Sequence, residues 1–175
     1  FGGRRLAAPP GRGTRPTSDR VREALFSILG PLDGEHVLDL YAGSGALGIE
    51  ALSRGAERAV FVERDRRAAA VLRENLAALG LGDPDAVVRR MDVAAALREA
   101  RERGETYSLV LCDPPYRLAA GLGGTLSEAL GPLLERGGRV VTESDRRDPL
   151  TLTFDLSDER RYGDTLIRIH TTHES

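Results

Sequence analysis

The sequence predicts an α/β fold in which helices cover both faces of a mostly parallel sheet. Short apolar runs alternate five times with longer segments whose apolar residues recur at helical spacing. A glycine-rich turn joins the first run to the segment after it. The C-terminal part departs from the alternation, because its apolar runs follow one another without a helix. This change predicts a closing antiparallel hairpin on the parallel sheet.

The expected elements follow from the apolar runs and from the residues that interrupt them. Thr17 or Ser18 is expected to cap a first helix, which ends at Gly30-Pro31. Gly163-Asp164 predicts the turn of the closing hairpin. Further helices are expected after the glycine turn and over 65–79, 93–103 and 125–136. Strands are expected over 37–40, 59–62, 86–91, 108–112, 139–143, 150–154, 158–162 and 166–170.

The glycine-rich turn lies within residues 37–48, VLDLYAGSGALG. Gly43, Gly45 and Gly48 match the pattern Gly-x-Gly-x-x-Gly, and the absence of side chains lets a ligand approach the backbone. Glu63 follows Gly43 by 20 positions, where nucleotide-binding folds place a carboxylate that contacts ribose. The free amides of the next helix suit a polar or anionic ligand. NAD and S-adenosylmethionine both fit this pattern.

Composition limits the class of protein. A chain of 175 residues is long enough for one domain with a buried core. The single cysteine, Cys112, excludes a disulfide framework and is typical of a reducing compartment. No run approaches the roughly 20 apolar residues of a membrane span, and no signal peptide is apparent, so we expect a soluble cytoplasmic protein. His36, His170 and His173 form no ligand pattern with Cys112, so no metal is expected.

Charge is distributed unevenly along the chain. All 25 basic residues are arginine, and the net charge is −2. Six arginines and one acid lie in the first 22 residues, which gives this part +5 and leaves −7 for the rest. Arginine pairs bidentately with phosphate, so a basic arm on an acidic body indicates a phosphate-rich partner. We therefore expect an arm over 1–17 and a domain over 18–175. Phosphate contacts are expected from Arg4, Arg5, Arg12, Arg15, Arg20 and Arg22.

Four acidic residues end the first four predicted strands. They are Asp39, Glu63, Asp92 and Asp113. Parallel strands bring their carboxyl ends to one edge of the sheet, where the ligands of such folds bind. The four side chains are therefore expected to converge on one binding site.

The stretch Asp113-Pro114-Pro115-Tyr116 discriminates between the two cofactors. Its two prolines fix an extended backbone, so the Asp113 carboxylate and the Pro114 carbonyl can accept hydrogen bonds in one pocket. Two fixed acceptors suit the exocyclic amine of a nucleobase, because they draw on its N–H bonds and free the lone pair for attack. The Tyr116 ring can stack on the base. An activated amine favours S-adenosylmethionine over NAD.

On these residues the chain resembles the class I S-adenosylmethionine-dependent methyltransferases that act on amino nitrogens. More narrowly, it resembles the bacterial 16S ribosomal RNA guanine-N2 methyltransferase family D. The arginine–proline–threonine entry and the run GSGALGIEALSRGA are specific to this family. The matching stretches extend over nearly the whole chain and are residues 11–26, 38–56, 61–63, 113–116 and 161–165.

The resemblance implies a Rossmann-like fold with a seven-stranded sheet, and methyl transfer from S-adenosylmethionine to the N2 amine of a guanine in 16S rRNA. It implies that Asp113 and Pro114 hold the amine and that Tyr116 stacks on the base. The partner would be 16S rRNA within a small-subunit assembly particle, and we expect a monomer. The implied cofactor site comprises Asp39, Tyr41, Ala42, Gly43, Ser44, Gly45, Gly48, Glu63, Arg64, Met91, Asp92, Val93 and Asp113.

Three alternatives remain open. A DNA adenine or cytosine amino-methyltransferase shares the Asp-Pro-Pro-Tyr motif, although 175 residues leave little room for a target-recognition domain. A protein-glutamine methyltransferase has asparagine where this chain has Asp113. The third alternative is an NAD-dependent oxidoreductase or a non-catalytic RNA-binding module with the same fold.

Overall fold

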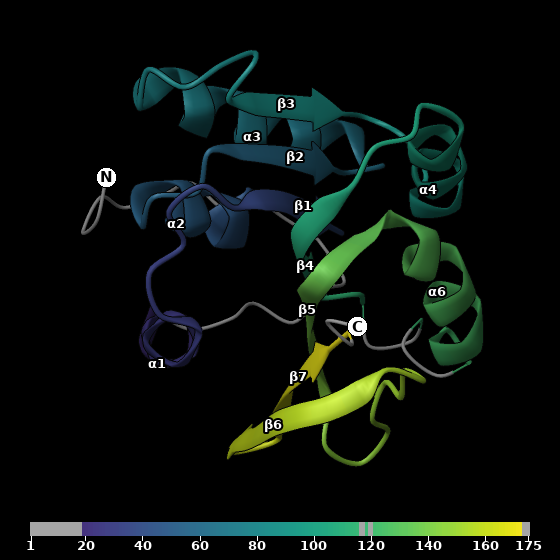
Figure 1. Ribbon diagram of the computed structural model, residues 1–175. Helices are drawn as coiled ribbons and strands as arrows, with labels where there is room; N and C mark the ends of the chain where they lie inside the picture. Colours follow the sequence, from purple (N-terminus) through teal and green to yellow (C-terminus); the bar gives the residue numbers. More distant parts are fainter. Residues whose placement is uncertain (1–18, 116–117, 119–120, 173–175) are drawn as a thin grey trace.

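The computed structural model describes residues 19–115, 118 and 121–172. A seven-stranded sheet forms its centre, with the strand order β3-β2-β1-β4-β5-β7-β6 (Figure 1). Strands β1 to β5 are mutually parallel, and β7 is antiparallel to both of its neighbours. The strands are β1 (His36–Leu40), β2 (Arg58–Val62), β3 (Ala86–Arg89), β4 (Tyr107–Cys112), β5 (Leu134–Asp145), β6 (Asp155–Tyr162) and β7 (Thr165–Thr171). The predicted fold class is confirmed.

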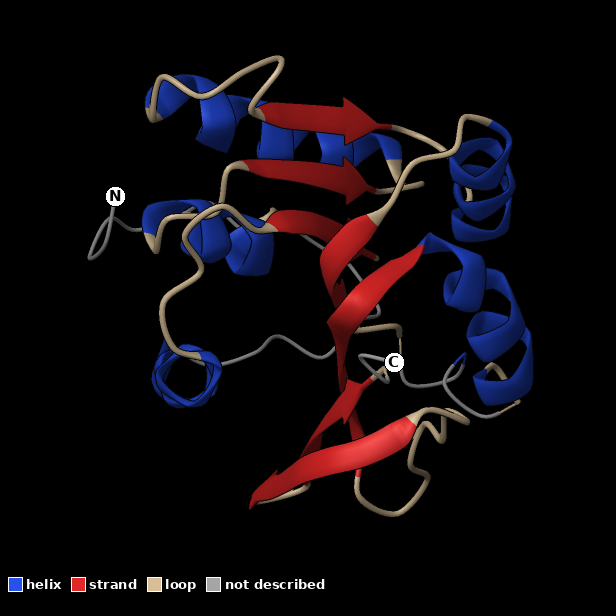
Figure 2. Cartoon of the chain, in the orientation of Figure 1, coloured by secondary structure: helices blue, strands red, loops and turns tan. Residues whose placement is uncertain are grey.

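Helices cover both faces of this sheet (Figure 2). The first three pack on one face and the last two on the other, as the two hydrophobic clusters show. They are α1 (Asp19–Leu29), α2 (Ala46–Ser53), α3 (Arg66–Ala78), α4 (Val93–Glu102) and α6 (Gly123–Leu130). None of the helices in the described part of the chain is long and apolar enough to cross a membrane. The arm over 1–17 lies outside the described residues.

Helix α1 shows why the local sequence determines the packing. Its buried face consists of Leu25, Phe26 and Leu29, which lie at helical spacing against the sheet. Complete burial of a side chain such as Phe26 stabilises the fold by about 1.5–3 kcal/mol. Gly30 then adopts a φ of 76°, which ends the helix as the sequence predicts. The predicted cap at Thr17 or Ser18 lies outside the described residues.

The region between β4 and β5 differs from the expectation of a helix over 125–136. Helix α6 ends at Leu130, and a 3-10 turn, η1 (Gly131–Leu133), follows it. Pro132 lies within that turn and lacks the amide that a continuing helix requires. Strand β5 therefore begins at Leu134, five residues before the expected position.

The expected strand over 150–154 is wrong. These residues have no strand assignment, although Leu150 and Leu152 are buried against the core beneath α4 and α6. Leu150 and Leu152 alternate with exposed residues because both pack into the core. A strand also needs a neighbouring strand to which its backbone can hydrogen-bond. The free edge of β5 is already occupied by β7, which pairs with it from Arg139↔Thr171 to Asp145↔Thr165. The hairpin turn at Gly163-Asp164 is confirmed.

Candidate active site

The carboxyl ends of β1 to β5, called the rim below, form the candidate site. The strand order reverses between β1 and β4, whose residues Leu40 and Cys112 are register partners. The loops that leave these two strands therefore begin side by side. Open α/β sheets bind ligands at this kind of topological switch point.

The glycine loop follows β1 with an unusual backbone. Gly43 and Gly45 have φ values of 60° and 90°, and Tyr41 adopts a φ of 56° without being glycine. A left-handed tyrosine is uncommon and indicates a backbone that its surroundings hold in place. A Cβ on Gly45 would lie 2.2 Å from Leu72 Cδ1 of α3. The glycine thus lets the loop pack directly on the helix, while residues 41–44 remain partly exposed.

Asp39 holds the start of α2 to the sheet. Its side chain is 1% exposed, and Oδ2 accepts a hydrogen bond from the Gly48 amide at 3.0 Å. Gly48 has no room for a side chain, because a Cβ would lie 2.4 Å from Phe61 Cε2. One oxygen of the Asp39 carboxylate thus accepts a hydrogen bond from the first turn of α2.

Glu63 fixes the glycine loop from the end of β2. Its Oε1 accepts from the Gly43 amide at 2.8 Å, and its Oε2 accepts from the Asp65 amide at 2.8 Å. The side chain is 3% exposed. Glu63 therefore lies against the glycine loop and also shapes that loop.

Asn75 supports the loop from the opposite side. Its Nδ2 donates to the Ser44 carbonyl at 3.0 Å from the buried face of α3. In the sequence, Asn75 interrupts the apolar face that Leu72 and Leu76 form, which is the signal that could have identified it. We infer that Asn75 positions the glycine loop, although no sequence motif assigns it to the site.

The remaining predicted cofactor residues lie around the same loop. Burial, with smaller effects from Cys112 and Asp92, raises the pKa of the Tyr41 hydroxyl well above its usual range, so Tyr41 is neutral. Asp92 is exposed and precedes α4, although β3 ends at Arg89 and not near Asp92 as expected. Met91 is half-buried, Val93 is buried, and Arg64 is exposed.

The Asp113-Pro114-Pro115 stretch leaves β4 next to the glycine loop. Asp113 and Pro115 are half-buried, and Pro114 is buried. Burial, with the carboxylates of Asp113 and Asp39, raises the pKa of the Cys112 thiol well above its usual range. Cys112 therefore stays protonated and is not an activated nucleophile. Tyr116 lies outside the described residues.

The predicted RNA-binding arginines lie mostly outside the described residues, namely Arg4, Arg5, Arg12 and Arg15. Arg20 is exposed on α1. Arg22 pairs with Asp19 at 2.8 Å and lies 3.9 Å from a Glu50 oxygen. Because nearby carboxylates offset the charge of Arg22, Arg20 is the better placed of the two for a phosphate.

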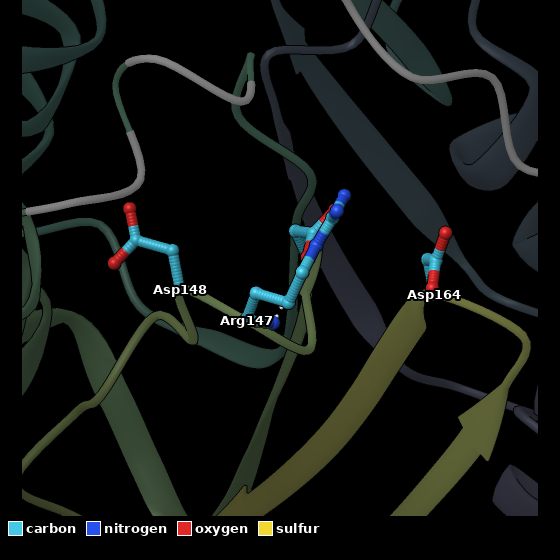
Figure 3. Close-up of a pocket in the computed structure, with 4 residues that line it drawn as sticks. Arg147, Asp148 and Asp164 are labelled. Atoms are coloured by element: carbon cyan, nitrogen blue, oxygen red, sulfur yellow. Dashed lines mark hydrogen bonds and ion pairs between the residues drawn. The ribbon is translucent and has the colours of Figure 1, made fainter.

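A surface pocket lies at the end of β5, beside the rim (Figure 3). Asp148 and Asp164 lie on either side of Arg147, which forms two hydrogen bonds of 2.9 Å with Asp145. The charged side chains that line this pocket are largely paired within the protein, so we assign no ligand to the pocket. Within residues 19–115, 118 and 121–172, no group of three histidine, cysteine, aspartate or glutamate side chains could hold a metal ion.

Comparison with known proteins places the chain in a family. The family described as "Conserved hypothetical protein 95" matches residues 1–171. The "Putative rRNA methyltransferase YlbH" of Bacillus subtilis is 43% identical over 175 residues, which cover 96% of this chain and 93% of that protein. The chain belongs to this family. The "Ribosomal RNA small subunit methyltransferase D" of Escherichia coli K12 is 41% identical over 143 residues, or 81% of this chain and 67% of the relative.

Solved structures agree with this assignment. The "Putative methyltransferase yhhF" of Escherichia coli superimposes with a TM-score of 0.83 at 34% identity, over 99% of this chain and 94% of that chain. An RNA methyltransferase from Salinibacter ruber, solved with S-adenosyl-L-homocysteine, has a TM-score of 0.68 at 21% identity, over 92% of this chain and 95% of that chain. The second likeness shows the fold alone.

Proposed function

We propose that this protein transfers a methyl group from S-adenosylmethionine to the exocyclic N2 amine of a guanine in 16S rRNA. The observation that carries the proposal is the placement of Asp113-Pro114 directly beside the glycine loop, through the pair Leu40↔Cys112. This pair brings an amine-binding motif and a nucleotide-binding motif to one switch point. The names of the relatives, which are rRNA methyltransferases, support the RNA substrate.

The residues at the ends of β1, β2 and β3 fit the proposed cofactor. Glu63 offers a carboxylate for ribose hydroxyls, and its contact with the Gly43 amide places it at the loop. The exposed Asp92 is available for a polar group of the adenine. The partly exposed loop residues 41–44 would face the methionine part, and the proposed set also includes Asp39, Gly45, Gly48, Arg64, Met91 and Val93. When bound, S-adenosylmethionine supplies the electrophilic methyl group.

The residues after β4 perform the chemistry of the acceptor. The Asp113 carboxylate and the Pro114 carbonyl accept the two N–H hydrogens of the amine, which draws the nitrogen towards a pyramidal geometry and frees its lone pair. The Pro-Pro backbone holds both acceptors before the substrate arrives, so catalysis comes from positioning and fixed charge. The methylated amine is acidic enough to lose its proton to Asp113 or to water. We further propose that Tyr116 stacks on the base.

The target nucleotide must leave its stack to reach Asp113, which costs a few kcal/mol. We propose that the N-terminal arm supplies compensating phosphate contacts, because the rest of the chain carries a net charge of −7 against +5 for the first 22 residues. We also propose that the substrate is a small-subunit assembly particle in the cytoplasm, and that the protein acts as a monomer without a metal ion.

Two measurements test the proposed function. Calorimetric titration with S-adenosylmethionine and with NAD should give binding of the first and none of the second. Transfer of a labelled methyl group to RNA from small-subunit assembly intermediates should yield N2-methylguanosine, whereas duplex DNA should give no product. NAD binding would favour an oxidoreductase, and cofactor binding with methylation of DNA alone would favour a DNA amino-methyltransferase.

A further inference from the structure

A fifth acidic side chain lies at the rim, beside the residues proposed to hold the amine. Glu143 of β5 is only 3% exposed. Cys112 of β4 and Thr142 of β5 are register partners, so Asp113 and Glu143 are the next residues on two adjacent parallel strands. Neighbouring strands lie about 4.8 Å apart. Asp113, directly after β4, and Glu143, within β5, therefore lie side by side.

Asp113 and Glu143 also belong to the same face of the sheet. Side chains alternate between faces along a strand. Leu111 and Val141, two residues earlier on the two strands, both pack in the core beneath α1, α2 and α3. Ile167 of β7, the register partner of Glu143, belongs to that core as well. The two carboxylates thus share one side of the rim.

The backbone of Glu143 pairs with β7, and the residues that follow it are fixed as well. Its pairing with β7 continues beyond Glu143 as far as Asp145, which is the register partner of Thr165. The Leu150 amide donates to Ser144 Oγ at 3.1 Å, and the Arg146 amide donates to the Asp164 carbonyl at 2.9 Å. A binding residue on a strand that is fixed in this way keeps a defined position relative to its neighbour.

The chemistry of guanine suits two adjacent carboxylates. Its N2 amine adjoins the ring N1–H, so one edge of the base carries donors at both positions. Adenine and cytosine have an unprotonated ring nitrogen beside the amine, and its lone pair would face a carboxylate unfavourably. We propose that Glu143 accepts the N1–H hydrogen of the target guanine and thereby selects guanine over the other amino bases. This role rests on the proposed function and concerns specificity.

An RNA substrate with 2-aminopurine at the target position tests the contact. This base keeps the amine at C2 but has a lone pair at N1. The wild-type protein should prefer guanine by roughly 10- to 100-fold in kcat/KM, the scale of removing a hydrogen bond to a charged group. Glu143→Gln should lower kcat/KM for guanine. It should not lower kcat/KM for 2-aminopurine, because the side-chain amide of the glutamine can donate to N1 of that base. The ratio of kcat/KM for guanine to that for 2-aminopurine should be at least about tenfold smaller in the variant than in the wild type.

Matched controls separate this role from a structural one. Glu74→Gln makes the same chemical change at an exposed position of α3 and should leave the preference unchanged. Thermal unfolding and S-adenosylhomocysteine titration should show that Glu143→Gln is folded and binds the cofactor product. An equal guanine preference in wild type and Glu143→Gln would overturn the proposal while leaving the proposed function intact.

The wild-type protein provides a test that does not depend on the variant. If it methylates guanine and 2-aminopurine with equal kcat/KM, no group reads N1 and the role of Glu143 is excluded. If it methylates neither RNA, the proposed function fails and the role of Glu143 fails with it. A preference of roughly 10- to 100-fold supports the contact.

Discussion

The acids at the ends of β1 and β2 accept hydrogen bonds from backbone amides, whereas Asp113, directly after β4, and Glu143, within β5, lie on adjacent strands beside a Pro-Pro step. We call these regions the cofactor half and the acceptor half of the rim. In the cofactor half, Asp39 and Glu63 shape the loop that would hold the ligand. In the acceptor half, Asp113 begins a Pro-Pro segment directly after β4. Substitutions should therefore change stability and affinity together in the first half, and turnover alone in the second.

The largest effect is expected in the acceptor half. Asp113→Ala should lower single-turnover methyl transfer by roughly two to three orders of magnitude, because it removes a partner of the transition state. Cofactor affinity and thermal stability should stay close to wild type. Single-turnover assays at saturating RNA, with calorimetry alongside, would measure both. A near wild-type rate would mean that the motif is only a rigid turn.

Glu63→Ala tests the cofactor half. It removes hydrogen bonds to a charged group, so S-adenosylmethionine should bind more weakly by about 1.5–3 kcal/mol, and the loop should lose stability as well. Asp65→Ala is the matched control. It removes the cap that accepts from the Ala68 amide at 2.8 Å, which should cost about 1 kcal/mol of stability without a change in cofactor affinity. Equal affinities in the two variants would remove Glu63 from the site.

Gly48→Ala tests whether close packing creates the loop. Its Cβ would meet Phe61 at 2.4 Å and Asp39 Oδ2 at 2.9 Å, so overpacking should lower the free energy of unfolding by about 1–3 kcal/mol. Cofactor affinity should fall in parallel. Gly124→Ala in α6, with open space around it, should be neutral or slightly stabilising. Chemical denaturation compares the two, and equal stabilities would contradict the packing argument.

The smallest effect is expected from the arm. Replacement of Arg4, Arg5, Arg12 and Arg15 by alanine should flatten the log–log salt dependence of RNA binding, by about 0.7 for each phosphate that is no longer neutralised. Cofactor affinity should not change. Arg73 and Arg101, exposed on α3 and α4, provide the control substitutions. A salt slope that is the same with and without the arm arginines would place the RNA surface elsewhere.

Periodicity predicted the sheet and its helices because burial on one face dictates the spacing of apolar residues. It could not predict hydrogen-bonding neighbours, which is why the alternation of Leu150 and Leu152 was interpreted as a strand. The rim acids were predictable because parallel strands align their ends. In the sequence, Glu143 only ends the expected strand over 139–143, and no motif includes Asn75. Their positions depend on register and on long-range packing.

The central claim is tested most directly by mapping methylated nucleotides in 16S rRNA from a strain that lacks this protein. Mass spectrometry of the RNA should show the loss of one N2-methylguanosine. The wild-type gene should restore the modification, and Asp113→Ala should not. An unchanged N2-methylguanosine content in the deletion strain would contradict the proposed function.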